Sequence, residues 1–193
     1  LYHWSHLELK RYFGLDCLIG PDTADRIWQV ANERLATMRI HDILAADKVA
    51  VICTTDDPAD PLATHEQIRA SGLTTRVYPA FRPDKALLVD QPVAFNAWLE
   101  KLAAAAKTPV ATFDNFLAAL DKRHADFHAV GARVSDHGME QCFAEPCTAA
   151  EAKVIFDAAR AGQAASRGQV AQFTSFMMLE FGRWDAKRGW TKQ

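Results

Sequence analysis

The sequence predicts an α/β fold, rich in helix, in which about three parallel strands with crossover helices follow a helical segment. Short apolar runs, each ending in a polar loop, alternate with longer stretches whose apolar residues recur every three or four positions. A composition of 49% hydrophobic and 24% charged residues over 193 positions is that of a globular domain, and it excludes a disordered chain.

The charge balance and the shortness of the apolar runs exclude two kinds of partner. Lys and Arg number 22 against 24 Asp and Glu, so we expect no binding to nucleic acid or to an anionic membrane. Runs such as Val49–Cys53 are far shorter than a membrane span, and no basic-then-apolar leader is visible. Leu1, a first residue other than Met, indicates a chain cut from something longer. We therefore expect a soluble, cytoplasmic piece of globular protein.

The cysteines are expected to be free thiols, because their spacing lacks the rhythm of a disulfide framework. They are Cys17, Cys53, Cys142 and Cys147. Cys53 lies in an apolar run and is predicted to pack as a small hydrophobic residue. A tetrahedral zinc needs a fourth ligand beside His137, Cys142 and Cys147, and no second close pair is present, so no metal site is predicted there.

The first predicted elements are a long helix, a strand and a second helix. A helical pattern runs from Pro21 to about Ala46. The run Val49–Cys53 is apolar throughout, which is typical of a strand buried on both faces of a parallel sheet. After a polar loop, residues 61–71 form a predicted helix that Gly72 ends.

The remaining elements are two further strands and four helices. Arg76–Phe81 is the second predicted strand, interrupted by Pro79, and residues 132–134 form the third. Two helices lie between these strands, and two follow them. Their apolar stripes and caps are Phe95, Trp98, Leu99 and Leu102; Phe113, Phe116, Leu117, Leu120 and Phe127; Thr148 and Glu151; and Val170, Phe173, Met177, Phe181 and Trp184.

A loop dense in functional groups follows each predicted strand. The three loops are Thr54–Pro58, Phe81–Lys85 and Ser135–Gly138. Because sites in α/β folds are assembled at the carboxyl ends of the strands, the three loops together predict a site at that edge. The alternative is that each loop is only a solvated turn, since Asp, Pro and Gly are ordinary turn residues.

Three strands cannot close a barrel, which needs eight in roughly 250 residues. If the architecture is a barrel, the chain holds a middle portion of it, with the helical segment of residues 1–46 ahead of the first strand. We expect an exposed strand edge and an uncovered apolar face in such a piece.

Five segments resemble segments of the bacterial uronate isomerases, also called glucuronate isomerases, in the same order and with similar spacing. They are Leu1–Gly14, Cys53–Pro58, Phe81–Lys85, Val134–His137 and Arg188–Trp190. The resemblance spans nearly the whole chain. It implies a (β/α)8 barrel of the amidohydrolase superfamily with a helical insertion between its first and second strands. Residues 1–46 would be that helical insertion segment, and residues 47–193 the partial barrel.

The resemblance also implies a reaction of carbohydrate metabolism. The family interconverts D-glucuronate with D-fructuronate, and D-galacturonate with D-tagaturonate, by moving a proton between C2 and C1 of the open-chain sugar. Its divalent metal, expected to be zinc, is held by a His-x-His pair on the first strand and an Asp after the last, and a His after the fifth strand joins the site. These segments fall outside this chain, so the chain is expected to carry no metal ligand and to be inactive alone. The whole protein is expected to be a homo-oligomer.

The resemblance assigns substrate-binding roles to six residues. Arg82 matches an arginine that contacts the uronate, and its planar fork suits a carboxylate; the alternative is a salt bridge with Asp84 or another loop carboxylate. Asp136 and His137 would orient sugar hydroxyls, or else form a hydrogen-bonded pair that stabilises their loop. Thr55, Asp56 and Asp57 would face the site, or else Asp56 and Asp57 begin the next helix.

Other histidines have simpler interpretations. His3 and His6 are expected to pack or to contact a partner, and His124 and His128 to lie at the surface or its boundary.

Two further classes of function stay open for the chain: a non-catalytic helical or α/β binding or assembly module, and a metal-dependent hydrolase of the amidohydrolase superfamily. The uronate-isomerase segments argue against the hydrolase.

Overall fold

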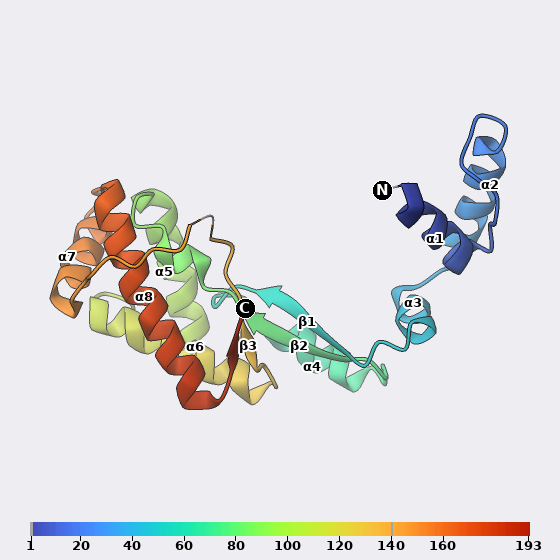
Figure 1. The fold of residues 1–193 in the computed structure, drawn as a ribbon. Coiled ribbons are helices and arrows are strands. Elements are labelled where there is room, and N and C mark those ends of the chain that lie inside the picture. Colours follow the sequence, from blue (N-terminus) through green and yellow to red (C-terminus); the bar gives the residue numbers. More distant parts are fainter. Residues whose placement is uncertain (1, 140) are drawn as a thin grey trace. The chain divides into compact units, whose positions relative to one another are not determined.

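The computed structural model describes residues 2–139 and 141–193, and it divides the chain into two compact units (Figure 1). The N-terminal unit comprises Leu1–Val51 with Leu73–Arg76, and the second unit comprises Ile52–Gly72 with Val77–Gln193. No helix among the described residues is both long enough and apolar enough to cross a membrane.

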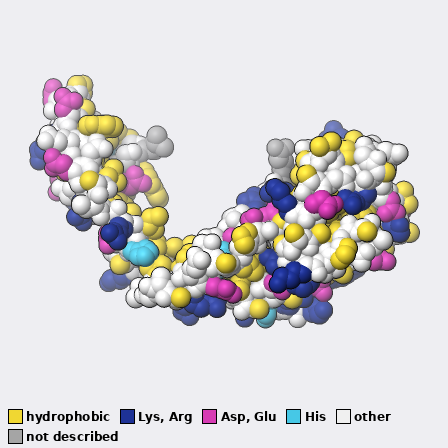
Figure 2. Space-filling view, turned by 180° about the vertical axis from the view of Figure 1, so that it is seen from behind, with side chains coloured by type: hydrophobic (Ala, Val, Ile, Leu, Met, Phe, Trp, Pro, Cys, Tyr) yellow, Lys and Arg dark blue, Asp and Glu magenta, His cyan; other side chains and the backbone are white. Residues whose placement is uncertain are grey.

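The N-terminal unit contains helices α1 (Tyr2–Phe13), α2 (Ala24–Leu35) and α3 (Ile40–Ala46). None of these helices has a buried residue, and apolar side chains remain on the surface of this unit (Figure 2). The prediction of one helix over residues 21–46 is wrong. The Asp42 carboxylate accepts the Arg39 backbone N–H at 3.0 Å, which caps a new helix at α3 instead of letting α2 continue.

The predicted α/β fold with parallel strands is confirmed. One sheet has the order β1 (Val51–Asp56), β2 (Arg76–Phe81), β3 (Val134–Ser135) and β4 (Thr191–Lys192). The pairs β2 with β3 and β3 with β4 are parallel. The pattern of apolar runs predicted three of these strands; β4 has two residues and no apolar run of its own.

The prediction that the first strand is buried on both faces is wrong. Along β1 the residues alternate between exposed and partly buried, and Val51 is 45% exposed. This strand stands at the edge of the sheet, and residues two apart share one face, so only one face is covered. Cys53 is consequently exposed rather than packed in the core, while all four cysteines are free thiols as predicted.

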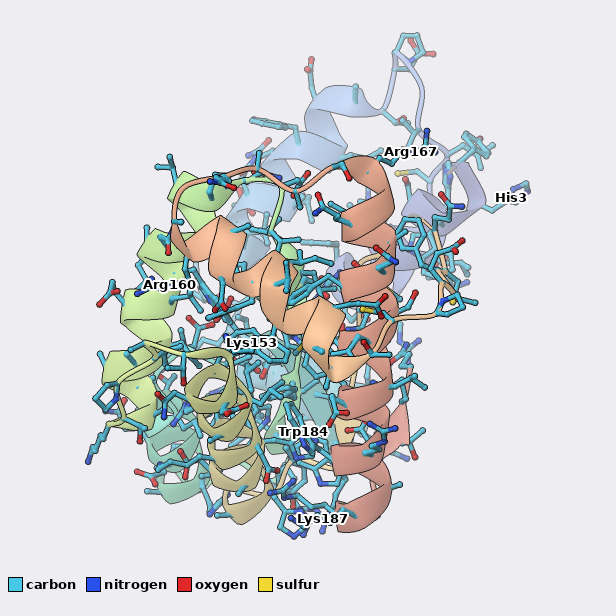
Figure 3. The ribbon with its side chains drawn as sticks, turned by 90° about the vertical axis from the view of Figure 1, so that its left-hand side faces the viewer. His3, Lys153, Arg160, Arg167, Trp184 and Lys187 are labelled. Atoms are coloured by element: carbon cyan, nitrogen blue, oxygen red, sulfur yellow. The ribbon has the colours of Figure 1, made fainter. Side chains whose placement is uncertain are left out.

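The second unit is built on a layer of helices. Their bounds are α4 (Ala63–Ala70), α5 (Pro92–Ala106), α6 (Phe113–Ala129), α7 (Ala149–Arg160) and α8 (Arg167–Arg188), with a 3-10 turn, η1 (Asp84–Leu87). Figure 3 shows α7 beside α8, which runs from the labelled Arg167 to Lys187. Buried phenylalanine rings pack between these helices; they are Phe95, Phe113, Phe116, Phe156 and Phe173.

The helix ends follow local chemistry. The hydroxyls of Thr112, Thr148 and Ser166 accept backbone N–H groups in the first turns of α6, α7 and α8. Gly189 ends α8 with a φ of 67°, in the left-handed region that glycine adopts without strain. The capping-box prediction at Thr148 is confirmed, since Glu151 returns a bond to the Thr148 backbone.

His124 is buried, not at the surface as predicted. Its Nε2 lies 2.9 Å from Asp185 Oδ1, and its ring stacks on Trp190 with centroids 3.8 Å apart. Burial lowers the pKa of His124 more than its hydrogen bond to Asp185 raises it, so the imidazole is neutral. His128 lies at the boundary as predicted and accepts the indole N–H of Trp190 at 2.9 Å.

Arg123 fixes the loop that follows β1. Its Nε donates to the Pro58 carbonyl at 2.7 Å and its Nη2 to the Asp60 carbonyl at 2.9 Å. Its Nη1 pairs with Asp126 on the same helix at 2.9 Å. The guanidinium is buried, so α6 holds the shape of this loop by bonds that water does not weaken.

Replacing Gly131 should destabilise the second unit. Gly131 has a φ of 104°, and a Cβ built there would lie 2.5 Å from the Tyr78 ring. We expect Gly131→Ala to lose about 1–3 kcal/mol of unfolding free energy in urea titrations, from backbone strain and this contact. Gly182→Ala is the matched control, since nothing lies within 4 Å of its added Cβ in α8, and helix propensity should raise its stability. Equal effects of the two substitutions would contradict the assignment.

Candidate functional site

The carboxyl ends of β2, β3 and β4 bring a cluster of charged side chains together. Phe81 pairs with Ser135, and Ser135 with Lys192, so the residues that follow the strands lie side by side. We call Arg82, Asp84, Asp136, His137 and Lys192 the strand-end cluster. All five belong to the second unit. The β1 loop reaches the same edge, because Asp56 accepts the Arg82 backbone N–H on its carbonyl at 2.9 Å and Asp57 Oδ2 lies 3.1 Å from Lys85 Nζ. The three predicted loops therefore meet at this edge.

Arg82 is held in place by Asp84. Its Nε donates to Asp84 Oδ2 at 2.8 Å, and its Nη1 lies 3.7 Å from Asp136 Oδ2. A Cβ at position 138 would lie 2.0 Å from Arg82 Nη2, so a side chain there would displace the guanidinium from this position. The salt bridge considered as an alternative for Arg82 is therefore present, but it uses the Nε edge. The Nη groups lie on a side chain that is 36% exposed.

Asp84 is the anion that organises this cluster. Its Oδ2 also accepts the Gly138 backbone N–H at 2.9 Å, and its Oδ1 lies 3.5 Å from His137 Nδ1. Burial alone would raise the pKa of Asp84. The donors of His137, Arg82 and Gly138 together lower it by more than burial raises it, and the resulting pKa is about 2. Asp84 is thus ionised at neutral pH and holds Arg82 through a charge-assisted bond.

His137 and Asp136 point in different directions from the same loop. The His137 side chain is only 3% exposed, its ring stacks on Phe181 with centroids 5.7 Å apart, and its Nε2 lies 2.8 Å from Lys192 Nζ. Asp136 does not bond to His137, so the pair considered as an alternative is not formed between them in the described residues. Asp136 Oδ1 is buried and has no hydrogen-bond partner within residues 2–139 and 141–193.

The side chains of the β1 loop are engaged elsewhere. Asp56 Oδ2 accepts the Thr54 hydroxyl at 2.6 Å and lies 3.7 Å from His65 Nε2. Thr55 lies on the opposite face of β1 from Thr54 and Asp56, and it is exposed. In the described part of the chain, no side chain of Thr55 or Asp56 contacts the strand-end cluster.

Asp57 shapes its own loop. Its Oδ1 accepts the Trp98 indole N–H and the Ala59 backbone N–H, each at 2.8 Å, and its Oδ2 lies 3.1 Å from Lys85 Nζ. The next helix, α4, has Leu62 as its N-cap, so Asp57 does not begin that helix. These contacts fill the carboxylate and leave it little capacity for a ligand.

Sequence reasoning missed the support behind the cluster. Lys192 Nζ lies 2.9 Å from Asp185 Oδ2, which also accepts the Ser135 hydroxyl at 2.7 Å. Burial alone would raise the pKa of Asp185. Hydrogen bonds from His124, Lys192 and Ser135 lower that pKa by more than burial raises it, so the carboxylate is ionised. Only Ser135 carried a signal, as the first residue of a predicted loop; Lys192 and Asp185 stood outside every motif.

The described residues do not assemble a metal centre. Within residues 2–139 and 141–193, no group of three or more His, Cys, Asp or Glu side chains lies in reach of one ion. His3 and His6 belong to no such group. The His6 ring bonds within its own unit, to the Tyr2 carbonyl and the Ile19 backbone N–H. The residues present therefore do not fit a metal, and no ligand is assigned to them.

Comparison with known proteins identifies close relatives. Residues 1–193 match the family described as glucuronate isomerase. The chain is 72% identical to the uronate isomerase of Opitutus terrae and 52% identical to that of Solibacter usitatus, over its full length in both. It covers 41% and 42% of those proteins. It thus spans about two fifths of the length of the curated relatives it matches.

Solved structures have the same fold. A crystal structure of uronate isomerase from Thermotoga maritima matches 100% of this chain and 42% of its own, with a TM-score of 0.93 and 30% identity. One of glucuronate isomerase from Caulobacter crescentus matches 98% of this chain and 40% of its own, with a TM-score of 0.89 at 23% identity. The family resemblance predicted from the five segments is confirmed.

The acid response of stability should report the Asp84 contacts. A carboxyl whose pKa is lowered from about 3.9 unfolded to about 2 folded adds stability above pH 4, and that stability is lost as the pH falls to about 2. Urea unfolding from pH 6 to pH 2.5 should therefore show Asp84→Asn less stable than wild type at pH 6, with the difference shrinking at low pH. Asp90→Asn, which removes an exposed carboxylate, is the control. A difference that stays constant for Asp84→Asn would contradict the assigned contacts.

Proposed function

We propose, from the fact that this chain belongs to the glucuronate isomerase family, that it forms part of a uronate isomerase. The reaction would interconvert D-glucuronate with D-fructuronate, and D-galacturonate with D-tagaturonate, by proton transfer between C2 and C1. The strand-end cluster would form one wall of the pocket. The observation that carries the proposal is the oriented guanidinium of Arg82, pinned at the carboxyl ends of a parallel sheet.

Arg82 would bind the carboxylate of the uronate. Asp84 occupies the Nε–H, which fixes the plane of the guanidinium, and the side chain as a whole is 36% exposed. A planar pair of N–H donors matches a carboxylate bidentately. Asp84 also offsets part of the positive charge of Arg82. The contribution of Arg82 to binding would therefore come from the fixed orientation of its guanidinium more than from its net charge.

Asp136 and His137 would position the sugar hydroxyls, His137 indirectly, since its side chain is 3% exposed and contacts Lys192 and Asp84. Asp136 Oδ1 is buried and has no partner within residues 2–139 and 141–193, so it would accept a hydroxyl that enters beside it, and Asp136 Oδ2 faces Arg82. Thr55 would face the same pocket from the uncovered face of β1, while Asp56 and Asp57 would support its rim through their own loop contacts. The divalent metal of the family, expected to be zinc, would be held by ligands outside this chain.

The partial coverage of its relatives supports the view that the chain holds an insertion and only part of a barrel. We infer that residues 1–46 are the helical insertion and residues 47–193 a portion of the barrel, completed by sequence beyond the two fifths of the relatives that this chain matches. The position of β1 at the edge of the sheet is consistent with a neighbouring strand supplied from there. The expected homo-oligomer and cytoplasmic location belong to that whole protein.

The 193-residue chain alone should have no isomerase activity, with or without added zinc or manganese. The chain supplies Arg82 and its neighbours but gathers no set of metal ligands among the described residues. Incubation with D-glucuronate followed by a ketose assay is expected to give background. Turnover above background would overturn both the placement of the metal site and the division of the barrel.

Arg82 should determine carboxylate recognition in the full-length protein. Removing one partner of a desolvated charge pair costs about 2–5 kcal/mol, so Arg82→Met should lower kcat/KM for D-glucuronate roughly 30- to 5,000-fold. Arg82→Lys keeps the charge but loses the fork and should fall between Arg82→Met and wild type. Arg76→Met, at the opposite end of β2, is the matched control and should leave kcat/KM near wild type.

An aldose without a carboxylate separates binding from folding. If residual turnover of D-glucose is measurable, Arg82→Met should lose discrimination between the two sugars, since only the uronate uses the missing contact. Equal losses for both sugars, or lowered thermal stability with normal kinetics, would mean that Arg82 does not bind the carboxylate.

A further inference from the structure

Lys192 belongs to the strand-end cluster, but the proposed function gives it no role of its own. Its Nζ lies within hydrogen-bond distance of three groups: Asp185 Oδ2 at 2.9 Å, Ser135 Oγ at 3.0 Å and His137 Nε2 at 2.8 Å. An ammonium has three N–H donors and no acceptor, so these three groups account for all of its hydrogen-bonding capacity. Asp185 is the carboxylate partner of Lys192 in an ion pair.

Proton counting around Lys192 leaves one arrangement. The Ser135 hydroxyl gives its own hydrogen to Asp185 Oδ2, so its oxygen is free to accept from Lys192. The third N–H of Lys192 then points to His137 Nε2, which must accept and carries no proton. In a neutral imidazole the proton is consequently on Nδ1, the nitrogen that lies 3.5 Å from Asp84 Oδ1.

We propose that Lys192 is a positioning residue that fixes His137 as the neutral Nδ1–H tautomer and places that nitrogen beside Asp84, the anion that holds Arg82. At 3.5 Å, His137 Nδ1 and Asp84 Oδ1 face each other without forming a hydrogen bond, and neither has another partner within residues 2–139 and 141–193. The contribution of this arrangement to turnover rests on the proposed function, whereas the tautomer itself does not. Phe181 keeps the ring in its plane by stacking, and Lys192 Nζ lies 6.0 Å from the centre of the same Phe181 ring. A 180° flip of the His137 ring would keep the stacking but break the Lys192 bond, and any other rotation would break both.

The anchor of Lys192 is itself fixed from α6. An ionised Asp185 can only accept, so His124 donates Nε2–H to Asp185 Oδ1 at 2.9 Å. His124, Asp185 and Ser135 are all buried, which limits their rotation. Side chains that orient a site residue in this way typically change activity 10- to 100-fold when they are removed. These successive contacts connect the buried His124 and Asp185 to Arg82 through Lys192, His137 and Asp84.

Nitrogen NMR of the full-length protein, labelled with 15N at histidine, tests the tautomer directly. The His137 signals, assigned by their loss in His137→Gln, should show a protonated Nδ1 and an unprotonated Nε2 at pH 7.5. An Nε2–H tautomer or an imidazolium in the wild-type protein would overturn the proposal. This measurement needs no substitution at Lys192, so it decides the tautomer even if the Lys192 variant does not fold.

Substitution then tests whether Lys192 is the cause. Lys192→Met should move His137 away from the pure Nδ1–H state, while Lys187→Met, which removes an exposed lysine of α8, should leave it unchanged. An unchanged His137 spectrum in folded Lys192→Met would overturn the role of Lys192. In the isomerase assay, Lys192→Met should lower kcat/KM for D-glucuronate about 10- to 100-fold. Absence of uronate turnover in wild type would overturn the proposed function and leave the tautomer result standing.

Discussion

A carboxylate taken out of water costs several kcal/mol unless it is paired, and the buried Asp185 carboxylate is paired from three elements. His124 of α6, Ser135 of β3 and Lys192 of β4 all contact it. Because Asp185 belongs to α8, its bonds to Ser135 and Lys192 hold β3 and β4 to that helix. The arrangement of the strand-end cluster depends on this one buried anion, since β3 and β4 have only two residues each and little ladder bonding of their own.

Local pattern accounted for much of the fold and for one side of the cluster. Arg76–Phe81 was predicted to the residue, and Arg82 with Asp84 lies in a turn that the sequence displays directly. The burial of His124 was also available in principle, because Leu120, His124 and Phe127 recur at helical spacing and share the apolar face of α6. That histidine was misjudged because its residue type was weighed above its position.

Other features could not be predicted from sequence, because they depend on partners far away in the chain. The exposure of Val51 and Cys53 depends on which neighbours cover β1, and an apolar run looks the same whether or not they are present. The roles of Asp56 and Asp57 differ from that of Asp136 only through contacts with His65, Trp98 and Lys85. A polar loop residue that holds its loop and one that faces a pocket have the same local sequence signature.

The distance along the chain between the residues that contact Asp185 and Lys192 has a consequence for how the protein folds. Arg82 and Asp84 are two residues apart and can meet in the unfolded chain, whereas Ser135 and Lys192 are separated by 57 positions and His124 and Asp185 by 61. Closing such loops costs entropy that only the packing of α6 against α8 returns. The Arg82 turn can therefore form early in folding. The His137 ring becomes oriented only after α6 and α8 have packed together. A fixed His137 ring thus indicates that the second unit has finished folding.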